Sequence, residues 1–321
     1  MRKRISVVTP CYNEEENALE LYKQIKEVFD QLPQYDYEHI YIDNSSKDET
    51  VRIVKEICRV DPNVKLIVNV RNFGHIRSPF HGLLQANGDA VILMVSDLQD
   101  PPTMIKDFIE KWEEGFKVVL GVKVESEETA AMFAIRKLYY NFINRISDIE
   151  LTRNNTGFGL YDKEVISILK DINDPYPYFR GLISDIGFES FKIPYKQPSR
   201  KRGITKNNFY TLYDMAMLGI TNHSKIPLRL ATIFGFALSF VSLLVAVVYF
   251  ILKLLLWKYI PFGIAPLVIG MFFFASVQLF FIGMLGEYVG AVHTQVLKRP
   301  LVIEKERVNF VKEESKTMLS V

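Results

Sequence analysis

Two carboxylates and a glutamine follow an apolar run in the first third of the chain. Residues 90–95 read AVILMV, and residues 96–102 read SDLQDPP. In an extended strand end, side chains at positions i and i+2 point the same way, so Asp97 and Gln99 are expected to offer oxygen atoms to one point. Mg²⁺ and Mn²⁺ prefer oxygen ligands, and Mg²⁺ usually takes one or two carboxylates together with substrate phosphates. The stretch therefore predicts a divalent metal site at Asp97 and Gln99.

Asp100 has an ordinary structural explanation. It precedes Pro101, and an Asp N-cap followed by a proline is a common way to begin a helix. We expect this role for Asp100 at least as much as a chemical one. Asp97 lies too far from the expected helix to be its cap, so capping does not explain it.

Polar side chains also follow the first two apolar runs. Residues 10–17 read PCYNEEEN, where Asn13 and Glu16 are close to a capping box, and residues 43–50 read DNSSKDET. Asp43 stands where a carboxylate can accept hydrogen bonds from a base or ribose, or can anchor a turn. Neither G-x-G-x-x-G after the first run nor G-x-x-x-x-G-K-[ST] anywhere is present. A carboxylate-rich edge without these loops predicts a nucleotide whose phosphates are bridged by a metal.

The elements that position these residues follow from apolar periodicity. Apolar strands alternate with helical patterns from residue 5 to about residue 121. Such alternation predicts a mainly parallel sheet with helices on both faces, and ligands bind such sheets beyond the carboxyl ends of the strands. The expected strands are 5–10, 38–43, 64–69, 90–95 and 117–121, and the expected helices are 13–32, 49–60, 78–87 and 104–114.

Composition narrows the class of protein. The chain has 321 residues, 49% of them hydrophobic, and a formal net charge of +2. This length allows about two units that each bury a core, and the small charge does not suggest a general nucleic-acid binder. Cys11 and Cys58 are the only cysteines, so we expect free thiols in a reducing compartment.

Two late stretches are long and apolar. Residues 228–256 and 263–288 each exceed the roughly 20 residues needed to cross a bilayer, so we expect two transmembrane helices. Lysines and arginines flank them at 225–229 and 298–307, which by the positive-inside rule places both termini in the cytoplasm. Residues 208–224 show the pattern of an amphipathic helix in the membrane interface, with packing on the soluble domain as the alternative.

These motifs together resemble the glycosyltransferase family 2 enzymes that use polyprenyl phosphate as acceptor, such as bactoprenol glucosyltransferases and dolichyl-phosphate mannose synthases. The similar stretches are VVTPCYNEEEN, DNSSKDET, VRNFGH, SDLQDPP, LGVK, RGLISDIGF, SRKRGITK and GITNHSKIPLRL, in order along nearly the whole chain. The resemblance implies a GT-A domain, Rossmann-like and mainly parallel, over 1–207. The interface helix (208–224), the two spans and a cytoplasmic tail (289–321) would follow it.

The resemblance also implies an activity. It is inverting transfer of a hexose from a nucleoside diphosphate sugar, with UDP-glucose as first choice, to undecaprenyl phosphate. The product would serve cell-envelope glycan modification at a bacterial inner membrane, with Mg²⁺ or Mn²⁺ as cofactor. A lipid phosphate is mostly a dianion at neutral pH, because its second pKa is about 6, so it can attack without a general base. Cationic side chains would instead bring the two anionic substrates together.

Positions in the motifs imply roles. Asp97 and Gln99 would bind the metal, and Arg200 and Lys206 the phosphates. Asp162 is expected to contact sugar or phosphate as a catalytic residue, with a surface ion pair as the alternative, and the same choice applies to Arg136. The residues expected to bind the nucleotide sugar are Pro10, Tyr12, Asn13, Glu14, Asp43, Ser96, Lys123 and Arg136.

Three positions depart from the pattern of the family. Val95 replaces the first Asp of D-x-D, Lys123 replaces an arginine, and Gly159 stands where many relatives carry Arg. These departures motivate an alternative hypothesis, a non-catalytic membrane scaffold or nucleotide sensor with a degenerate GT-A domain. A processive synthase is disfavoured because Q-x-x-R-W is absent and only two spans are expected. Two spans in each chain are also expected to support self-association.

Overall fold

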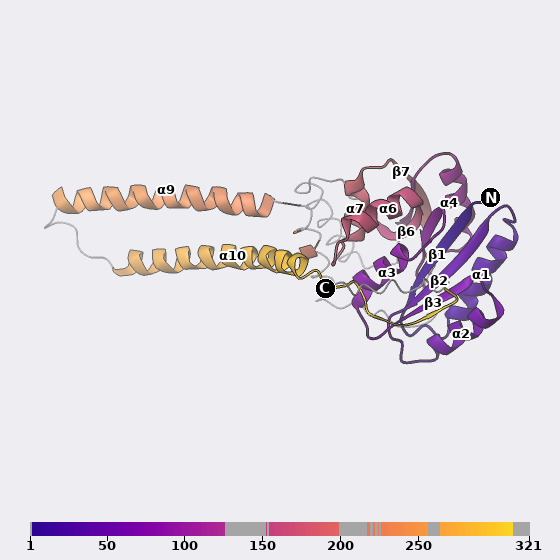
Figure 1. Ribbon diagram of the computed structural model, residues 1–321. Helices are drawn as coiled ribbons and strands as arrows, with labels where there is room; N and C mark the ends of the chain where they lie inside the picture. The colour runs from indigo at the N-terminus through magenta and orange to yellow at the C-terminus, as the bar shows by residue number, and fades with distance from the viewer. Residues whose placement is uncertain are drawn as a thin grey trace, which may run out of the picture. The chain divides into compact units, whose positions relative to one another are not determined.

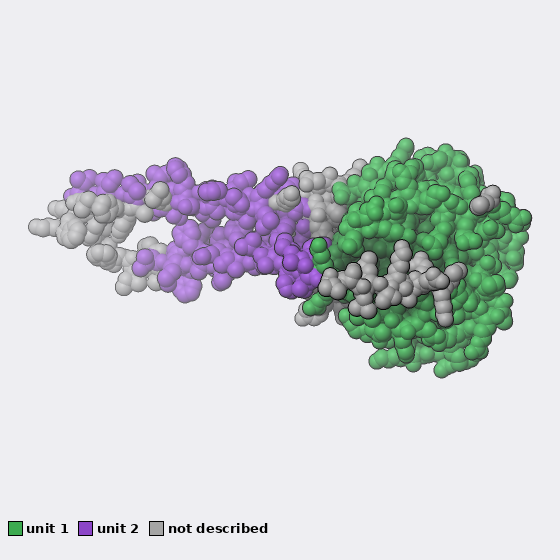
Figure 2. All heavy atoms as spheres, viewed as in Figure 1, with its two compact units in different colours: residues 1–140, 149–208, 298–321 green, residues 141–148, 209–297 purple. Residues whose placement is uncertain are grey.

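The computed structural model describes residues 2–125, 152, 154–198, 217, 218, 221, 224, 226–255 and 264–310. The chain divides into two compact units, which Figure 2 colours separately. The first unit comprises residues 1–140, 149–208 and 298–321, and the second comprises 141–148 and 209–297. The candidate site residues discussed below belong to the first unit.

The first unit is built on a twisted sheet with strand order β7-β5-β6-β4-β1-β2-β3-β8 over the described residues (Figure 1). β6 pairs antiparallel with β4 and β5, and β8 pairs antiparallel with β3, whereas the other pairings are parallel. The mainly parallel sheet predicted from the sequence is confirmed. The strands are β1 (Arg4–Cys11), β2 (Asp36–Asp43), β3 (Val64–Asn69), β4 (Ala90–Leu93), β5 (Val118–Glu125), β6 (Asn155–Asp162), β7 (Ser190–Lys196) and β8 (Glu304–Val308).

Helices cover both faces of this sheet because side chains alternate along each strand. Ile5 and Val7 of β1 pack in the cluster that includes α1 and α4, while Val8 packs in the cluster of α3, α6 and α7. A third cluster joins α2 to β2 and β3. The helices are α1 (Ala18–Asp30), α2 (Thr50–Val60), α3 (Gly74–Leu84), α4 (Met104–Glu113), α6 (Lys163–Ile172) and α7 (Phe179–Ile186).

Both predicted N-caps are wrong. Helix α1 begins at Ala18 after Asn17, not after Asn13, whose φ of 55° is left-handed. Helix α4 begins at Met104 after Thr103, so Asp100 does not cap it. Both polar residues are therefore available for contacts between loops.

Strand β8 belongs to what we call the C-terminal strap, residues 298–310. Sequence patterns did not predict that this segment joins the sheet. The strap lies along β3, as Figure 1 shows in yellow. Asn309 donates from Nδ2 to the carbonyls of Cys58 and Val64 over 2.7 and 2.8 Å. Lys55 pairs with Glu306 at 2.6 Å, and Val302 is buried. The strap is thus part of the sheet of the first unit.

The second unit contains two long helices, α9 (Ile226–Leu255) and α10 (Ile264–Val296). Among the described residues, one helix is long and apolar enough to cross a membrane, Gly270–Val296, and a shorter apolar stretch covers Ile226–Ser242. A first span at 228–256 therefore stays a prediction. Most of the expected interface helix, 208–224, lies outside the described residues.

Candidate active site

Hydrogen bonds hold together the loops after β1 and β2. These loops lie where the parallel strands end, which we call the carboxyl edge of the sheet. Asn13 donates its backbone N–H to Ser46 Oγ over 2.8 Å, and its Oδ1 accepts from the backbone N–H of Lys47, also over 2.8 Å. Glu14 donates its backbone N–H to Thr50 Oγ1 at 2.8 Å. The left-handed backbone at Asn13 turns its amide toward the neighbouring loop, a conformation that Asn tolerates better than most residues. Asn13 thus links the two loops through its hydrogen bonds to Ser46 and Lys47.

Asp43 ends β2 and is fully buried. Its Oδ2 accepts from the backbone N–H of Ser46 over 2.9 Å, and its Oδ1 accepts from the Ser46 hydroxyl. Burial raises the pKa of Asp43, and the hydrogen bonds from Ser46 oppose that rise. Asp43 therefore fixes the loop that follows it.

Cys11 lies beside Asp43, with Sγ 3.9 Å from Oδ1. Burial raises the pKa of the Cys11 thiol, and the charges of Asp43, Glu14 and Asp48 raise it further. A thiol among carboxylates stays protonated, so Cys11 is not a nucleophile. The concentration of acidic groups here fits a site that receives a cation or the donor groups of a nucleoside.

Asp97 lies on a turn, and the reasoning that paired it with Gln99 was wrong. Strand β4 ends at Leu93, and Leu98 has a φ of 60°, so the alternation of an extended strand does not continue to Gln99. Instead Asp97 Oδ1 accepts from the backbone N–H of Gln99 over 3.2 Å. The side-chain Nε2 of Gln99 donates to the carbonyl of Pro198 over 3.4 Å. Gln99 stays a metal-ligand candidate only through its side-chain oxygen.

Asp100 holds this turn in place. It is 2% exposed, its Oδ2 accepts from the backbone N–H of Val95 over 3.3 Å, and its Oδ1 accepts from the Tyr195 hydroxyl over 3.1 Å. Burial raises the pKa of Asp100 to about 6. Sequence reasoning missed this role because its partner Tyr195 is 95 positions away.

Lys123 lies at the same edge, near the end of β5. Its Nζ donates to Gln197 Oε1 over 2.7 Å, and its charge acts to lower the pKa of Asp100. The structure thus brings Lys123 toward the Asp97 turn, and its role in binding nucleotide sugar stays a prediction. Arg136, Arg200 and Lys206 lie outside the described residues.

A divalent metal fits this turn. Asp97 is partly exposed, and the described residues hold no group of three His, Cys, Asp or Glu side chains able to bind a metal by themselves. Mg²⁺ commonly uses one or two carboxylates and completes its shell with phosphates and water, so such a cage is not required. Asp97 would hold the cation together with a substrate diphosphate.

The remaining predicted binding residues lie near the end of β1 or in the loops after β1 and β4. Pro10 lies within β1, opposite Ile42 of β2, and Ser96 is buried in the turn that precedes Asp97. Tyr12 and Glu14 are half-buried in the loop after β1, where the Glu14 carboxylate accepts from Asn17 Nδ2 over 2.7 Å. Their placement on one edge is consistent with a shared nucleotide site.

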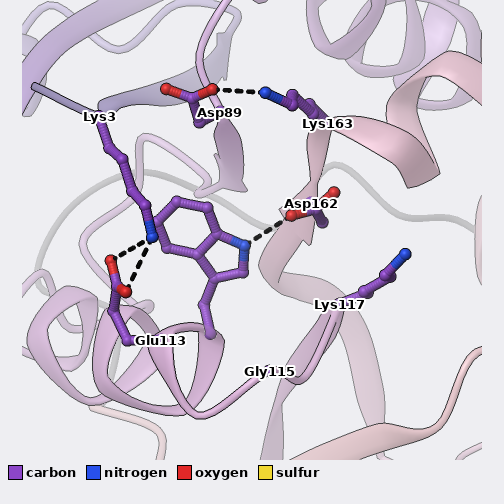
Figure 3. Close-up of a pocket in the computed structure, with 8 residues that line it drawn as sticks. Lys3, Asp89, Glu113, Gly115, Lys117, Asp162 and Lys163 are labelled. Carbon is purple, nitrogen blue, oxygen red and sulfur yellow. Dashed lines mark hydrogen bonds and ion pairs between the residues drawn. The ribbon is translucent and has the colours of Figure 1, made fainter. Parts of the chain in front are cut away.

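Asp162 lies at the opposite edge of the sheet, so its predicted catalytic role is wrong. Strand β6 runs antiparallel to β4, which pairs Asp162 with Ala90 at the start of β4. The carboxylate accepts from the backbone N–H of Glu164 at 2.9 Å and caps α6, and it accepts from Trp112 Nε1 at 2.7 Å (Figure 3). Ion pairs Lys3–Glu113 and Lys163–Asp89 surround it there. Asp162 is structural.

Close packing against β5 explains why residue 159 is a glycine. A Cβ at this position in β6 would lie 2.4 Å from the Val119 carbonyl oxygen and 3.2 Å from Leu120 Cα. Those atoms are backbone of the neighbouring strand β5 and have no room to move. The absence of an arginine at Gly159 therefore does not indicate a degenerate site.

The mainly parallel sheet with helices on both faces and an acidic carboxyl edge is typical of a glycosyltransferase domain of the GT-A type. Residues 6–168 match the Glycosyl transferase family 2 domain, and the chain belongs to this family.

The chain is 34% identical over 305 residues to the uncharacterized glycosyltransferase YkcC of Bacillus subtilis (strain 168), with 93% of this chain and 92% of that protein covered. It is 34% identical over 304 residues to the SfII prophage-derived bactoprenol glucosyl transferase of Shigella flexneri, covering 94% and 98%. Glucosyl-3-phosphoglycerate synthase of Mycobacterium tuberculosis, solved with Mn²⁺ and UDP, is 18% identical with a TM-score of 0.48, covering 68% and 76%.

Proposed function

We propose that this glycosyltransferase moves a hexose, with UDP-glucose as the first candidate donor, to undecaprenyl phosphate with inversion at the anomeric carbon. The observation that carries this proposal is similarity at 34% identity over 94% of the chain to a bactoprenol glucosyl transferase. Because 98% of that relative is covered, the similarity includes its C-terminal region as well as its family 2 domain.

The chemistry asks little of the protein beyond positioning and charge. The lipid phosphate is mostly a dianion at neutral pH, since its second pKa is about 6, and one of its oxygens displaces the nucleoside diphosphate from the sugar. A divalent cation held at Asp97 would offset the charge on the departing diphosphate. Asp43 orders the loop beside the nucleoside, and Lys123 places positive charge near the Asp97 turn.

The strap supports the proposed membrane topology. Strand β8 pairs with β3, so the chain before α9 and the chain after α10 lie on the same side of any membrane. The segment between them must then cross an even number of times. A crossing by α10 alone is incompatible with that pairing, which favours two spans with the active site and both termini in the cytoplasm, as the basic residues at 298–307 suggest.

The test is transfer of labelled sugar from a panel of UDP- and GDP-sugars by the full-length protein in detergent, with Mg²⁺ or Mn²⁺. Undecaprenyl phosphate is the acceptor, and undecaprenol, which lacks the phosphate, is the matched control. We expect a mild-acid-labile glycolipid from UDP-glucose with the phosphate acceptor only. Product from another donor would correct the sugar. Nucleotide binding without product from any donor would favour the nucleotide sensor, for which Val95 remains the main argument.

Self-association of the helical unit remains a proposal. Light scattering of the purified protein in detergent, corrected for the bound detergent, measures it directly. A mass equal to one chain of 37.1 kDa would contradict it.

A further inference from the structure

Three arginines gather where the strap passes the start of α3, away from the Asp97 turn. The guanidinium Cζ of Arg71 lies 4.0 Å from the centroid of the Phe73 ring, and that of Arg77 lies 5.4 Å from the same centroid. Arg77 donates from Nη2 to the carbonyl of Pro300, which brings Arg299 into the same neighbourhood. We call Arg71, Arg77 and Arg299 the arginine cluster.

Within the part of the chain that the structure describes, no acidic side chain offsets the charge of the cluster. Arg71 donates to the carbonyl of Asn72 over 3.0 Å and Arg77 to that of Pro300, and no carboxylate of the described residues pairs with any of the three. Burial lowers the pKa of Arg77, and the charges of Arg71 and Arg299 lower it further. Like charges held together without a counterion destabilise one another, and a bound anion would relieve this repulsion.

Arg77 also has an unused donor. Its Nε is buried and has no hydrogen-bond partner in the structure. An unsatisfied buried donor destabilises the fold, and more so when it is charged. A guanidinium binds phosphate through two parallel N–H groups. An oxyanion that reaches Arg77 would therefore supply the hydrogen-bond acceptor that its Nε lacks.

The cluster is separate from the proposed metal and diphosphate site. Arg71 follows β3, whereas Asp97 follows β4, and β1 and β2 lie between these strands. Three strand spacings amount to about 14 Å. One diphosphate cannot sit at both places, so the anion of the cluster is a different group.

The chain indicates where that anion comes from. Arg299 follows Val296, the last residue of α10, by three positions, and three residues of chain span at most about 11 Å. Helix α10 contains the segment Gly270–Val296, which is long and apolar enough to cross a membrane. A helix of this kind ends near lipid headgroups, so Arg299 lies within their reach.

We propose that Arg71, Arg77 and Arg299 form a binding site for the phosphate group of a membrane lipid. This inference depends on the proposed membrane location of α10, and it does not depend on glycosyl transfer. The phosphate belongs either to the polyprenyl acceptor or to a bulk anionic phospholipid, and both present the same oxyanion to the arginines.

The experiment measures lipid binding to the full-length protein by native mass spectrometry. The probes are undecaprenyl phosphate, phosphatidylglycerol, undecaprenol without a phosphate, and inorganic phosphate, and UDP binding is measured in parallel. The variants are Arg71→Gln, Arg299→Gln and their double. Arg77→Lys keeps the positive charge but removes the two parallel N–H groups of the guanidinium. Lys305→Gln, which removes one exposed positive charge from β8, is the matched control. Melting temperatures establish that each variant is folded.

We expect each glutamine variant to weaken lipid binding about fivefold, because one cation near a lipid phosphate contributes about 1 kcal/mol. The affinity of the double variant for the phosphate lipids should fall about 25-fold. Lys305→Gln should bind these lipids as wild type does, and undecaprenol should bind equally to every variant. If the glutamine variants lose affinity for undecaprenyl phosphate alone, the bound phosphate is that of the acceptor. If they lose affinity for both phosphate lipids, the cluster is a general site for lipid headgroups.

Three outcomes would overturn the proposal: equal lipid affinity in wild type and the double variant, weaker binding of UDP instead of lipid, or a change confined to inorganic phosphate. Because binding is read directly, a protein without transferase activity would still give a clear answer.

Discussion

Tyr195 donates its hydroxyl hydrogen to Asp100 Oδ1 over 3.1 Å and so joins the end of β7 to the turn that carries Asp97. The same carboxylate accepts from the backbone N–H of Val95 on its other oxygen. The turn is therefore fixed from two sides, by its own backbone and by a distant strand. This arrangement accounts for an otherwise costly buried carboxylate.

Removing the Tyr195 hydroxyl should loosen the turn. Tyr195→Phe keeps the ring, which packs edge-on against Phe158 at 5.5 Å, but leaves Asp100 Oδ1 without this donor. We expect a loss of about 1–3 kcal/mol in the free energy of unfolding, with a several-fold lower kcat. Thermal melts and steady-state kinetics measure the two effects. Tyr35→Phe, which removes a surface hydrogen bond to Glu113, is the control, and equal effects of both variants would refute the assignment.

Asp97 and Asp162 should respond in opposite ways to the loss of a carboxylate. Asp97→Asn is expected to lower the transfer rate about 100-fold or more, since electrostatic groups at a reacting centre typically contribute that much. Removal of divalent cations with a chelator should do the same to wild type. Asp162→Asn keeps a helix cap at the other edge of the sheet and should stay within a few-fold of wild type. Full turnover in Asp97→Asn or in chelator would exclude the metal role.

Asp43 should matter for nucleotide affinity. Asp43→Asn replaces one acceptor oxygen with an amide that faces the Ser46 donors, so the loop after β2 loses its fixed geometry. Hydrogen bonds to charged groups contribute about 1.5–3 kcal/mol, which predicts UDP binding weaker by roughly 10- to 100-fold. Isothermal titration calorimetry measures this change. Asp36→Asn, at the exposed start of β2, should leave the affinity unchanged.

Gly159 should not tolerate a side chain. Gly159→Ala places a methyl group against the Val119 carbonyl, and we expect a loss of about 1–3 kcal/mol from overpacking. Gly235→Ala in α9 is the matched control, because nothing lies within 4 Å of the added atom. Differential scanning calorimetry compares the two. An unchanged transition in Gly159→Ala would mean that the sheet accommodates the methyl group, and that the missing arginine needs another explanation.

Glu304 should make the strap sensitive to acid. Burial raises the pKa of Glu304, but hydrogen bonds from His81 and Arg307 outweigh this effect and hold it at about 2. Because the pKa in the folded state lies below the ordinary value of 4.5, the carboxylate stabilises the fold above pH 4.5. That contribution is lost as the pH falls toward 2.

Glu304→Gln should therefore lower the melting temperature at pH 7 and reduce its fall between pH 4.5 and 2. Thermal melts over a pH series provide the measurement. Glu306 lies on the same strand with its side chain 42% exposed. Glu306→Gln should therefore change little, both in the melting temperature at pH 7 and in its fall between pH 4.5 and 2. A Glu304→Gln curve parallel to that of wild type would contradict the assignment.

Most elements of the sheet were predictable because their apolar periodicity is strong. The expected strand at 64–69 coincides with β3, and the apolar residues Leu21, Ile25 and Phe29 are buried along α1 as their spacing required. Strand β8 was not predictable. It reads EKERV, without an apolar face, and is held by backbone pairing and ion pairs at an edge.

The candidate site was predictable in position but not in geometry. Polar residues after parallel strands had to meet at one edge, which placed Asp43 and Asp97 correctly on it. The direction of β6 depends on how the strand pairs, which a local pattern does not reveal, so the sequence did not show that Asp162 lies at the opposite edge. The left-handed Leu98 is likewise a tertiary effect, because leucine has no local preference for that conformation.

The position of β8 has a consequence for biosynthesis. The 107 residues from 197 to 303, which include both long helices, are translated after β7 and before β8. At about 5–20 residues per second, the edge of β3 stays unpaired for roughly 5–20 s after β7 is complete. An open edge strand is a template for pairing with other chains. A fragment that stops before the helices would never close the edge and should aggregate.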